Sequence, residues 1–543
     1  MNRHILKRVQ GILGRTKEMR RTFIILLLIS WSVTACQDAL EERYARPGDS
    51  EPSIDKLLTR LLDDNRVRPS YWEMSTMVNW HIGVYSQTVG FLNSDFIYQQ
   101  NEQYIQERWN DFYRPSANGA GVMAQYREME RLYGSMDPAE QEEWQVFMCA
   151  ARIKLMDQAT RLVDLWGDIP FSEAGMLNAT GMIVYPKFDD GEAVYRSAIN
   201  QLAADAQNLG TIKLSTVSAS LFAEQDILLK GNVSMWQRYA NALRLRLLMR
   251  ISATNADTIR TTVLGMLSDP LRFPLPGGDG EYVPGKDDVL LSPLATYADD
   301  LHAAFTDWTN YPAPYYLLEH VLKPVDDPRI PVMFDKYGAY SGLVFSPNES
   351  YRGLPVDAPA IEQEGELGGY AILDSATFLL NNQLPGVIMT TAEVDFLRAE
   401  AFARWGGGDA ARAYSQGLKH SVQFYYYLNT LGNRPTQMAQ PTNELLETFV
   451  SRDDVRLPAS TDERLSRIWV QKWAHFGFLQ AYDAWAELRR TNYPRLHFRP
   501  AASNGDLPPM RLTYPLSEKS FNPNYADVAP ADLRSQKVFW DVD

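Results

Sequence analysis

Apolar residues recur at helical spacing along most of this 543-residue chain, and this pattern limits the fold more than any other feature. Near the beginning, Ile54, Leu57, Leu58, Leu61 and Leu62 follow the spacing of a helix with one buried face, and Ser53 suits its N-cap. The same period predicts helices over 103–133 (interrupted at Pro115 and Gly119), 138–166, 189–209, 232–252, 258–268, 391–404, 409–429, 443–450 and 462–489. The chain is therefore predicted to be mainly α-helical.

Several of these helices follow one another as hairpins. The clearest pair is 391–404 and 409–429, joined by Gly406, Gly407 and Gly408. Hairpins of this kind cannot bury their apolar faces alone, so they stack. Residues 269–360 differ, because prolines and glycines break every long period and indicate short strands and long loops. We expect a tetratricopeptide-like scaffold of helical pairs with a loop-rich capping region; segments 70–100 and 490–543 are also expected to be irregular.

The first 35 residues have the anatomy of an export signal. Basic residues precede an uncharged run from Thr22 to Val33, which is shorter than the roughly 20 apolar residues that span a bilayer. Cys36 follows this run, at the position of the acyl acceptor of a lipoprotein. We expect a signal peptide over 1–35, a lipid anchor at Cys36 on a tether over 36–52, and a single domain over 53–543. An ordinary secretory signal or an uncleaved anchor is the alternative, and translation from Met1 or from Met19 would fit.

Charge and cysteine content exclude some classes of function. The chain carries a net charge of −14; the segment before Cys36 holds seven basic residues and one acidic residue, so its removal leaves a charge near −20. Such a charge argues against nucleic acid and anionic membrane surfaces as partners. Acylation of Cys36 would leave Cys149 without a disulfide partner. Cys149 lies in an apolar stretch, where we expect a buried thiol.

A series of motifs runs through the chain in a fixed order. The most distinctive is Asp164-Leu165-Trp166-Gly167-Asp168-Ile169-Pro170-Phe171-Ser172-Glu173-Ala174. The others are Tyr185-Pro186-Lys187-Phe188-Asp189, Asp226 with Gly231-Asn232 and Trp236, Tyr239 through Arg246, Asp327-Pro328-Arg329, Tyr351 through Pro355, Met389 through Ala401, Gln471-Lys472-Trp473, Trp485 through Pro494, and Arg511 with Tyr514-Pro515. Together these segments resemble the SusD/RagB family of outer-membrane nutrient-binding proteins, in particular its second SusD-like subgroup. Asn232 and Ala242 depart from the residues usual in that family.

The resemblance implies a function as well as a fold. Members of this family are lipid-anchored at the outer face of the outer membrane, and an irregular capping region holds the ligand. The implied partner is a SusC-like TonB-dependent transporter, which the lipoprotein covers like a lid. The implied ligand is an oligosaccharide, with a peptide as the alternative. The resemblance predicts neither the identity of the ligand nor whether calcium is bound.

The residues themselves do not indicate an enzyme. No nucleophile-elbow, zinc-protease or P-loop motif is present, and the seven histidines lack metal-ligand spacing. We therefore expect no catalytic residue, no metal site and no cofactor. A surface glycoside hydrolase stays open as an alternative, because its two carboxylates meet only in space; a purely structural surface protein is the third possibility. The charges embedded in the motifs are expected to be paired: Asp168, Glu173, Arg244, Arg246, Glu393, Glu487, Arg489 and Arg490.

A glycan site needs flat aromatic rings for stacking and polar side chains for the hydroxyl groups. Two loop-rich regions, 71–98 and 297–351, offer both. The candidate ligand-binding residues are Trp80, Asn93, Asp95, Tyr98, Trp308, Tyr311 and Tyr340. The alternative is that these side chains pack the core or contact the transporter.

Overall fold

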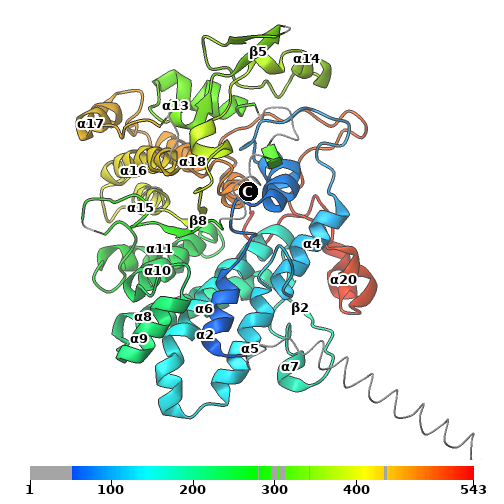
Figure 1. Ribbon diagram of the computed structural model, residues 1–543, viewed down its shortest axis with the longest axis vertical. Helices are drawn as coiled ribbons and strands as arrows, with labels where there is room; N and C mark the ends of the chain where they lie inside the picture. Colours follow the sequence, from blue (N-terminus) through cyan, green and yellow to red (C-terminus); the bar gives the residue numbers. More distant parts are fainter. Residues whose placement is uncertain are drawn as a thin grey trace, which may run out of the picture. The chain divides into compact units, whose positions relative to one another are not determined.

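The computed structural model describes residues 52–278, 280–294, 303–305, 312–341, 343–432 and 437–542. The chain divides into two units, Met1–Ser53 and Ile54–Asp543, and all the elements below belong to the second unit. The predicted signal peptide, the lipid anchor at Cys36 and nearly all of the tether lie outside the described residues. Figure 1 follows the second unit from its first helix (blue) to its last (red).

The first half is helical, as predicted. The expected interruption near Pro115 and Gly119 separates α4 from α5. Helix α6 begins with a capping box between Asp137 and Glu140 and ends at Gly167, whose φ of +80° suits a residue without a side chain. The helices are α2 (Ile54–Leu62), α3 (Gly83–Tyr85), α4 (Glu102–Tyr113), α5 (Val122–Gly134), α6 (Pro138–Trp166), α7 (Leu177–Thr180), α8 (Gly191–Thr211), α9 (Thr216–Gln225), α10 (Val233–Arg250) and α11 (Ala256–Ser268).

The second half returns to helical pairs. The predicted single helix over 462–489 is instead two, because Gly477 adopts a φ of +49° and ends α18. The helices are α15 (Thr391–Trp405), α16 (Ala410–Leu431), α17 (Asn443–Ser451), α18 (Thr461–Phe476), α19 (Ala481–Thr491), α20 (Leu516–Phe521) and α21 (Tyr525–Val528), followed by the 3-10 turn η7 (Ala529–Ala531).

The middle of the chain is irregular, as expected. The helical pieces there are α13 (Ile330–Met333), α14 (Ala360–Gly365), the π-helices η3 (Tyr316–Leu322) and η6 (Ser375–Leu379), and the 3-10 turns η4 (Lys323–Val325) and η5 (Leu367–Gly369). The strands pair antiparallel in twos: β1 (Ile169–Pro170) with β2 (Phe188–Asp189), β3 (Val289–Leu291) with β8 (Gly386–Met389), β4 (Phe334–Asp335) with β7 (Ile372–Leu373), and β5 (Gly338–Ser341) with β6 (Val344–Pro347).

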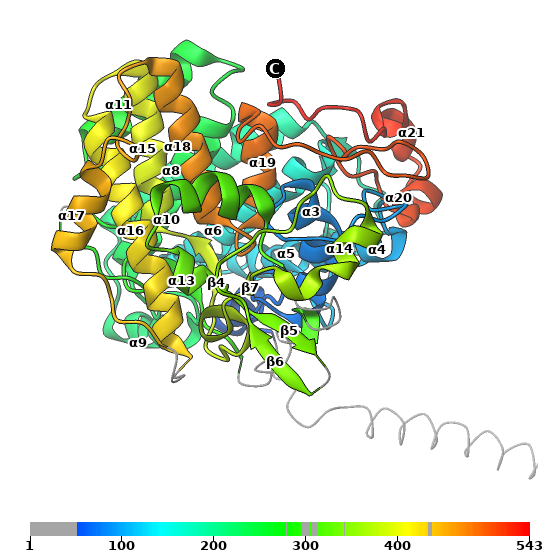
Figure 2. The same ribbon diagram turned by 90° about the horizontal axis from the view of Figure 1, so that it is seen from above.

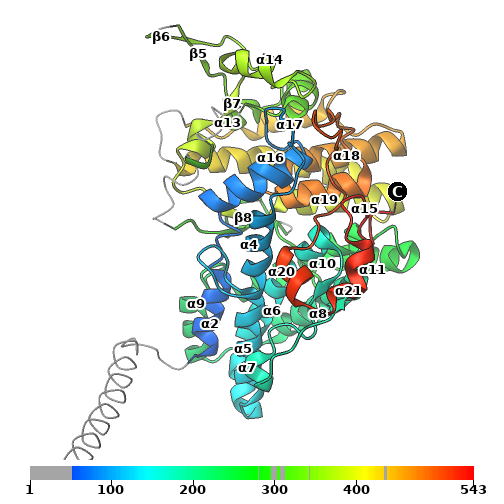
Figure 3. The ribbon, with the colours of Figure 1, turned by 90° about the vertical axis from the view of Figure 1, so that its right-hand side faces the viewer.

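Neighbouring helices pack as pairs, which confirms the predicted fold class. Helix α15 packs on α16 and α18, and α10 packs on α8. Seen from above, α11, α15 and α18 gather on one side and α4, α20 and α21 on the other (Figure 2). The β5–β6 hairpin and α7 lie at opposite ends of this unit in two views (Figures 1 and 3).

Most of the motif charges form ion pairs inside this scaffold. Arg246 donates to both oxygens of Glu393, at 2.6 and 2.7 Å. Burial acts to raise the pKa of Glu487, but Arg490 and Lys472 hold it well below its usual range. The predicted pairing is confirmed for these residues. It is wrong for Arg244, whose buried Nε has no partner within the described part of the chain.

The remaining thiol is buried as predicted. Cys149 is fully covered in the core. Burial raises the pKa of its thiol to about 12, so it stays protonated and unreactive at neutral pH.

Candidate functional site

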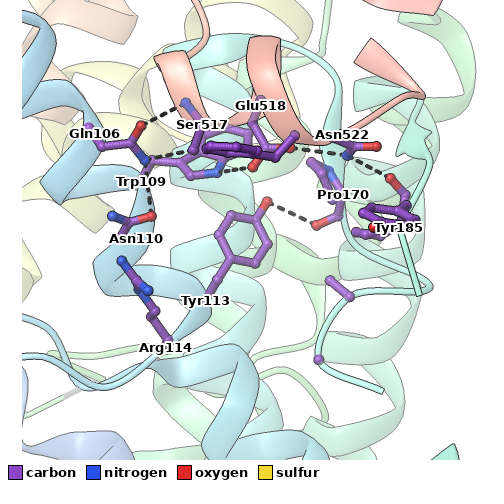
Figure 4. A pocket seen from close by; sticks show the side chains of 14 residues that line it. Gln106, Trp109, Asn110, Tyr113, Arg114, Pro170, Tyr185, Ser517, Glu518 and Asn522 are labelled. Carbon is purple, nitrogen blue, oxygen red and sulfur yellow. Dashed lines mark hydrogen bonds between the residues drawn. The ribbon is translucent and has the colours of Figure 1, made fainter. Parts of the chain in front are cut away.

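The most distinctive motif ends at a cavity of about 590 Å³ beside α4 and α20, which we call the α4–α20 cavity (Figure 4). After α6 the chain turns at Gly167, and the Asp168 carboxylate accepts from the backbone N–H of Gly191 at 2.9 Å. This contact places Pro170 at the wall of the cavity. The lining residues are Gln106, Trp109, Asn110, Tyr113, Arg114, Pro170, Ala174, Gly175, Tyr185, Pro186, Ser517, Glu518, Phe521 and Asn522.

The polar groups around this cavity are bonded to one another. Gln106 donates to Ser517 Oγ at 2.8 Å, and Trp109 Nε1 donates to Glu518 at 3.1 Å (Figure 4). Tyr113 donates its hydroxyl to the carbonyl oxygen of Pro170 at 2.9 Å. These bonds tie α4 to the tail of the chain and to the motif. The hydroxyls, amides and carboxylates in these bonds are already engaged, whereas the exposed side chain of Arg114, which also lines the cavity, makes no hydrogen bond or ion pair to the described residues.

A second surface lies on the first predicted loop region. Residues Glu73–Ile82 form a π-helix, η1, where the sequence predicted a loop. Helices of this type are rare in proteins, and those that occur often lie at functional sites. Most of η1 is buried, but Trp80 is 41% exposed and Trp72, just before it, is 46% exposed. The ring of Trp80 meets that of Tyr104 edge-on, with centroids 6.5 Å apart. We call this pair, the exposed Trp80 and the partly buried Tyr104, the Trp80 face.

The buried side of η1 explains why Trp80 faces outward. Glu73 forms an ion pair with Arg66 at 3.2 Å and accepts the hydroxyl of Tyr482. His81 contacts the carbonyl of Thr76 and accepts from the backbone N–H of Asn101, at 2.6 and 3.0 Å. Burial lowers the pKa of His81 to about 4, so the ring is neutral at neutral pH.

The structure brings the two predicted loop regions together. Asn79 on η1 donates to the carbonyl of Ala304 at 3.4 Å. A side chain at Gly90 would lie 2.0 Å from the carbonyl oxygen of Pro312, so the backbones meet there directly. The two regions predicted to supply a ligand site therefore meet beside η1.

The predicted ligand-binding residues are placed differently from one another. Trp80 and Asp95 are exposed. Asn93 is buried and donates to the carbonyls of Val356 and Ala358, at 2.9 and 2.8 Å.

Tyr98 is also buried, and its hydroxyl donates to the carbonyl of Arg499 at 3.1 Å. Asn93 and Tyr98 therefore support the loops and do not offer these donors to a ligand. Tyr340 lies on β5. Trp308 and Tyr311 lie outside the described residues.

Tyr104 was not predicted, although it completes the Trp80 face. It lies in a regular helix, α4, outside the two loop-rich regions where the sequence predicts a site. The signal that could have found it is Asn101, a strong N-cap residue that begins α4 just after the first loop region.

Within the described residues, no group of three histidine, cysteine, aspartate or glutamate side chains is arranged to hold a metal ion. None of the described helices is both long enough and apolar enough to cross a membrane.

Comparison with known proteins identifies the family. The sequence model SusD-like_2, described as starch-binding and associating with the outer membrane, matches residues 55–515. No curated protein sequence matches the chain. A solved chitin-binding protein aligns with a TM-score of 0.70 at 22% identity, covering 90% of this chain and 100% of its own.

Two further structures agree with this result. A chitin-binding SusD homolog from Flavobacterium johnsoniae gives a TM-score of 0.68 at 19% identity, covering 90% of this chain and 99% of its own. A SusD homolog from Bacteroides fragilis gives 0.66 at 18% identity, with the same coverage. At these identities the likeness shows the fold alone. Because the sequence model spans most of the chain, the protein belongs to the SusD-like family, as its motifs predicted.

Proposed function

We propose that this protein captures an oligosaccharide at the outer face of the outer membrane and passes it, without hydrolysis, to a SusC-like TonB-dependent transporter. The observation that carries the proposal is the exposed Trp80 beside Tyr104, on the π-helix η1, whose buried Asn79 contacts the second loop region. A flat ring held by a buried helix can stack on the apolar face of a sugar. The description of the family as starch-binding supports the ligand class.

The membrane part of the proposal rests on Cys36. Acylation there would tether the domain through residues 37–52 and leave it free to move against a membrane partner. A Cys36→Ala protein is expected to leave the outer-membrane fraction. Co-purification of a TonB-dependent transporter with the tagged, lipidated protein would support the partner.

Calorimetric titration of the purified protein with maltotriose and with chitin trisaccharide tests the ligand. Trp80→Ala is expected to weaken binding about fivefold or more, because one stacking ring is lost. Phe521→Ala is the control, since Phe521 is an exposed ring that lines the α4–α20 cavity instead. Equal binding by wild type and Trp80→Ala would contradict the assignment, and release of shorter sugars would contradict the non-catalytic role.

A further inference from the structure

A second cavity, of about 540 Å³, lies beside α18 and shares no lining residue with the Trp80 face. We call it the α18 cavity. Five helical elements build it, η3, η4, α16, α17 and α18, together with the segment 452–458 and the segment after α19. Its lining includes Tyr316, His320, Glu463, Arg467, Tyr493 and Arg495.

Several polar groups around this cavity have no partner. The side chains of Glu463 and Arg495 are exposed, and neither makes a hydrogen bond or ion pair to the described part of the chain. The hydroxyls of Tyr316 and Tyr493 likewise lack a hydrogen bond to any described residue. Behind the cavity wall, the ring of Trp469 lies tilted against that of Tyr493, with centroids 5.5 Å apart, and the buried Nε1 of Trp469 has no partner in the same part of the chain. Glu463, Arg495 and the two phenols line the cavity, so their unpaired groups are available to a ligand that enters it.

Other groups hold the walls in place. Arg467 donates to the carbonyls of Asp454 and Arg456, at 3.2 and 2.5 Å. Gln471 accepts from Arg329 at 2.7 Å. The free groups are therefore mounted on fixed elements, as a binding site requires.

The rings give the cavity flat apolar surfaces. Arg495 lies over the ring of Tyr493, 5.2 Å from its centroid. On the neighbouring helix η3, the rings of Tyr316 and His320 lie tilted against each other, with centroids 5.2 Å apart. Burial raises the pKa of Tyr316, so its hydroxyl stays protonated and can both donate and accept.

We propose that the α18 cavity binds a short oligosaccharide, at a site separate from the Trp80 face. Sugar hydroxyls both donate and accept, so they can pair with a phenol, a carboxylate and a guanidinium in one cavity. The C–H face of the sugar would lie on the tyrosine rings. The cavity size fits a small ligand. The choice of a saccharide rests on the proposed function, whereas the position of the site does not.

Two other ligand classes fit less well. An apolar ligand would displace water from these unpaired groups without forming hydrogen bonds to them, which costs free energy. An extended peptide is commonly bound by adding a strand to an exposed sheet edge. No β-strand of the described residues lines the α18 cavity.

The test pairs a screen on a broad glycan array with calorimetry on maltotriose, on chitin trisaccharide and on the strongest array ligand. The key variant is Glu463→Ala with Arg495→Ala, which removes two exposed, unpaired groups. Glu142→Ala with Arg260→Ala is the matched control, because it makes the same charge changes on exposed helical positions elsewhere. We expect the key variant to weaken one class of glycan site at least tenfold, with an unchanged melting temperature, and the control to bind like wild type. Tyr493→Phe should give a smaller loss.

The outcomes separate this inference from the proposed function. Two sites in the wild type, one lost in Trp80→Ala and the other in the key variant, would support both. A single site that is lost in Trp80→Ala and kept in the key variant would overturn the inference alone. A site lost only in the key variant would support the inference and overturn the Trp80 assignment. No glycan binding at all, or binding of array peptides that the key variant abolishes, would overturn the inference.

Discussion

The α4–α20 cavity and the α18 cavity have similar volumes, about 590 and 540 Å³, but they differ in how many of their polar side chains are bonded to the rest of the chain. Around the first, the side chains of Gln106, Trp109 and Tyr113 donate hydrogen bonds to other parts of the chain. Around the second, Glu463, Tyr493 and Arg495 keep their side-chain polar groups unpaired with the described residues. Volume alone therefore does not distinguish a structural cavity from a ligand site. The number of lining polar side chains that are already hydrogen-bonded within the chain does.

The difference also indicates where substitutions should act. Substitution of a lining residue whose hydrogen bonds stabilise the fold should lower the free energy of unfolding. Substitution of a lining residue whose polar groups are unpaired should weaken ligand binding and leave the free energy of unfolding unchanged. The predictions below use this contrast, from the largest expected effect to the smallest.

Trp109→Ala should lower the free energy of unfolding by about 3–5 kcal/mol, because it removes a buried ring and leaves Glu518 without its indole partner. Tyr493→Ala in the α18 cavity, where the ring is partly exposed, should cost about 1 kcal/mol. Urea unfolding followed by circular dichroism measures both. Equal losses for the two variants would break the comparison.

Acid should weaken the α4 side of the molecule through His81. Burial lowers the pKa of this ring from its ordinary value near 6.5 to about 4. Between pH 6.5 and pH 4, His81 is therefore protonated in the unfolded chain and neutral in the folded chain. Stability is therefore lost as the pH falls through this window, by about 2 kcal/mol at pH 5 for this residue.

His81→Gln should remove that share of the loss, measured by urea unfolding at pH 7 and pH 5. His475, whose pKa burial and Arg329 lower to about 3, is left in place and keeps its own share. An unchanged difference between the two pH values would show that His81 does not control this response.

Gln106→Ala should cost about 1–2 kcal/mol, because the backbone N–H and the hydroxyl of Ser517 lose their partners. Glu463→Ala should change stability by less than about 0.5 kcal/mol, since its side chain has no bond to lose among the described residues. Thermal unfolding of the two variants side by side measures the contrast. A destabilised Glu463→Ala protein would show that this wall also serves the fold.

The scaffold could be predicted from the sequence because its helices carry long, regular apolar periods. The capping box of α6 and the triple glycine between α15 and α16 mark their ends locally. The π-helix η1 could not be predicted, because its burial depends on Arg66 and Tyr482, and the latter is far away in the chain. The division of α18 from α19 was missed because one glycine, Gly477, sets it.

The candidate sites were predicted less well than the scaffold. Region 71–98 was chosen for its aromatic residues, and Trp80 is exposed there as a glycan site requires. Asn93 and Tyr98 look equally suitable in sequence, but their donors are taken by carbonyl groups that only the folded chain brings near. The α18 cavity could not be predicted, because its lining residues come from four separate segments of the chain, 316–325, 414, 449–471 and 493–495.

The bonds between α4 and the tail carry a consequence for the timing of folding. Gln106 bonds Ser517 and Trp109 bonds Glu518 across 411 and 409 positions of the chain. Contacts this distant in sequence form late and slow the folding of a domain. Helix α4 therefore gains these partners only after nearly the last residues have been made, so this part of the unit is completed after the rest of the first half.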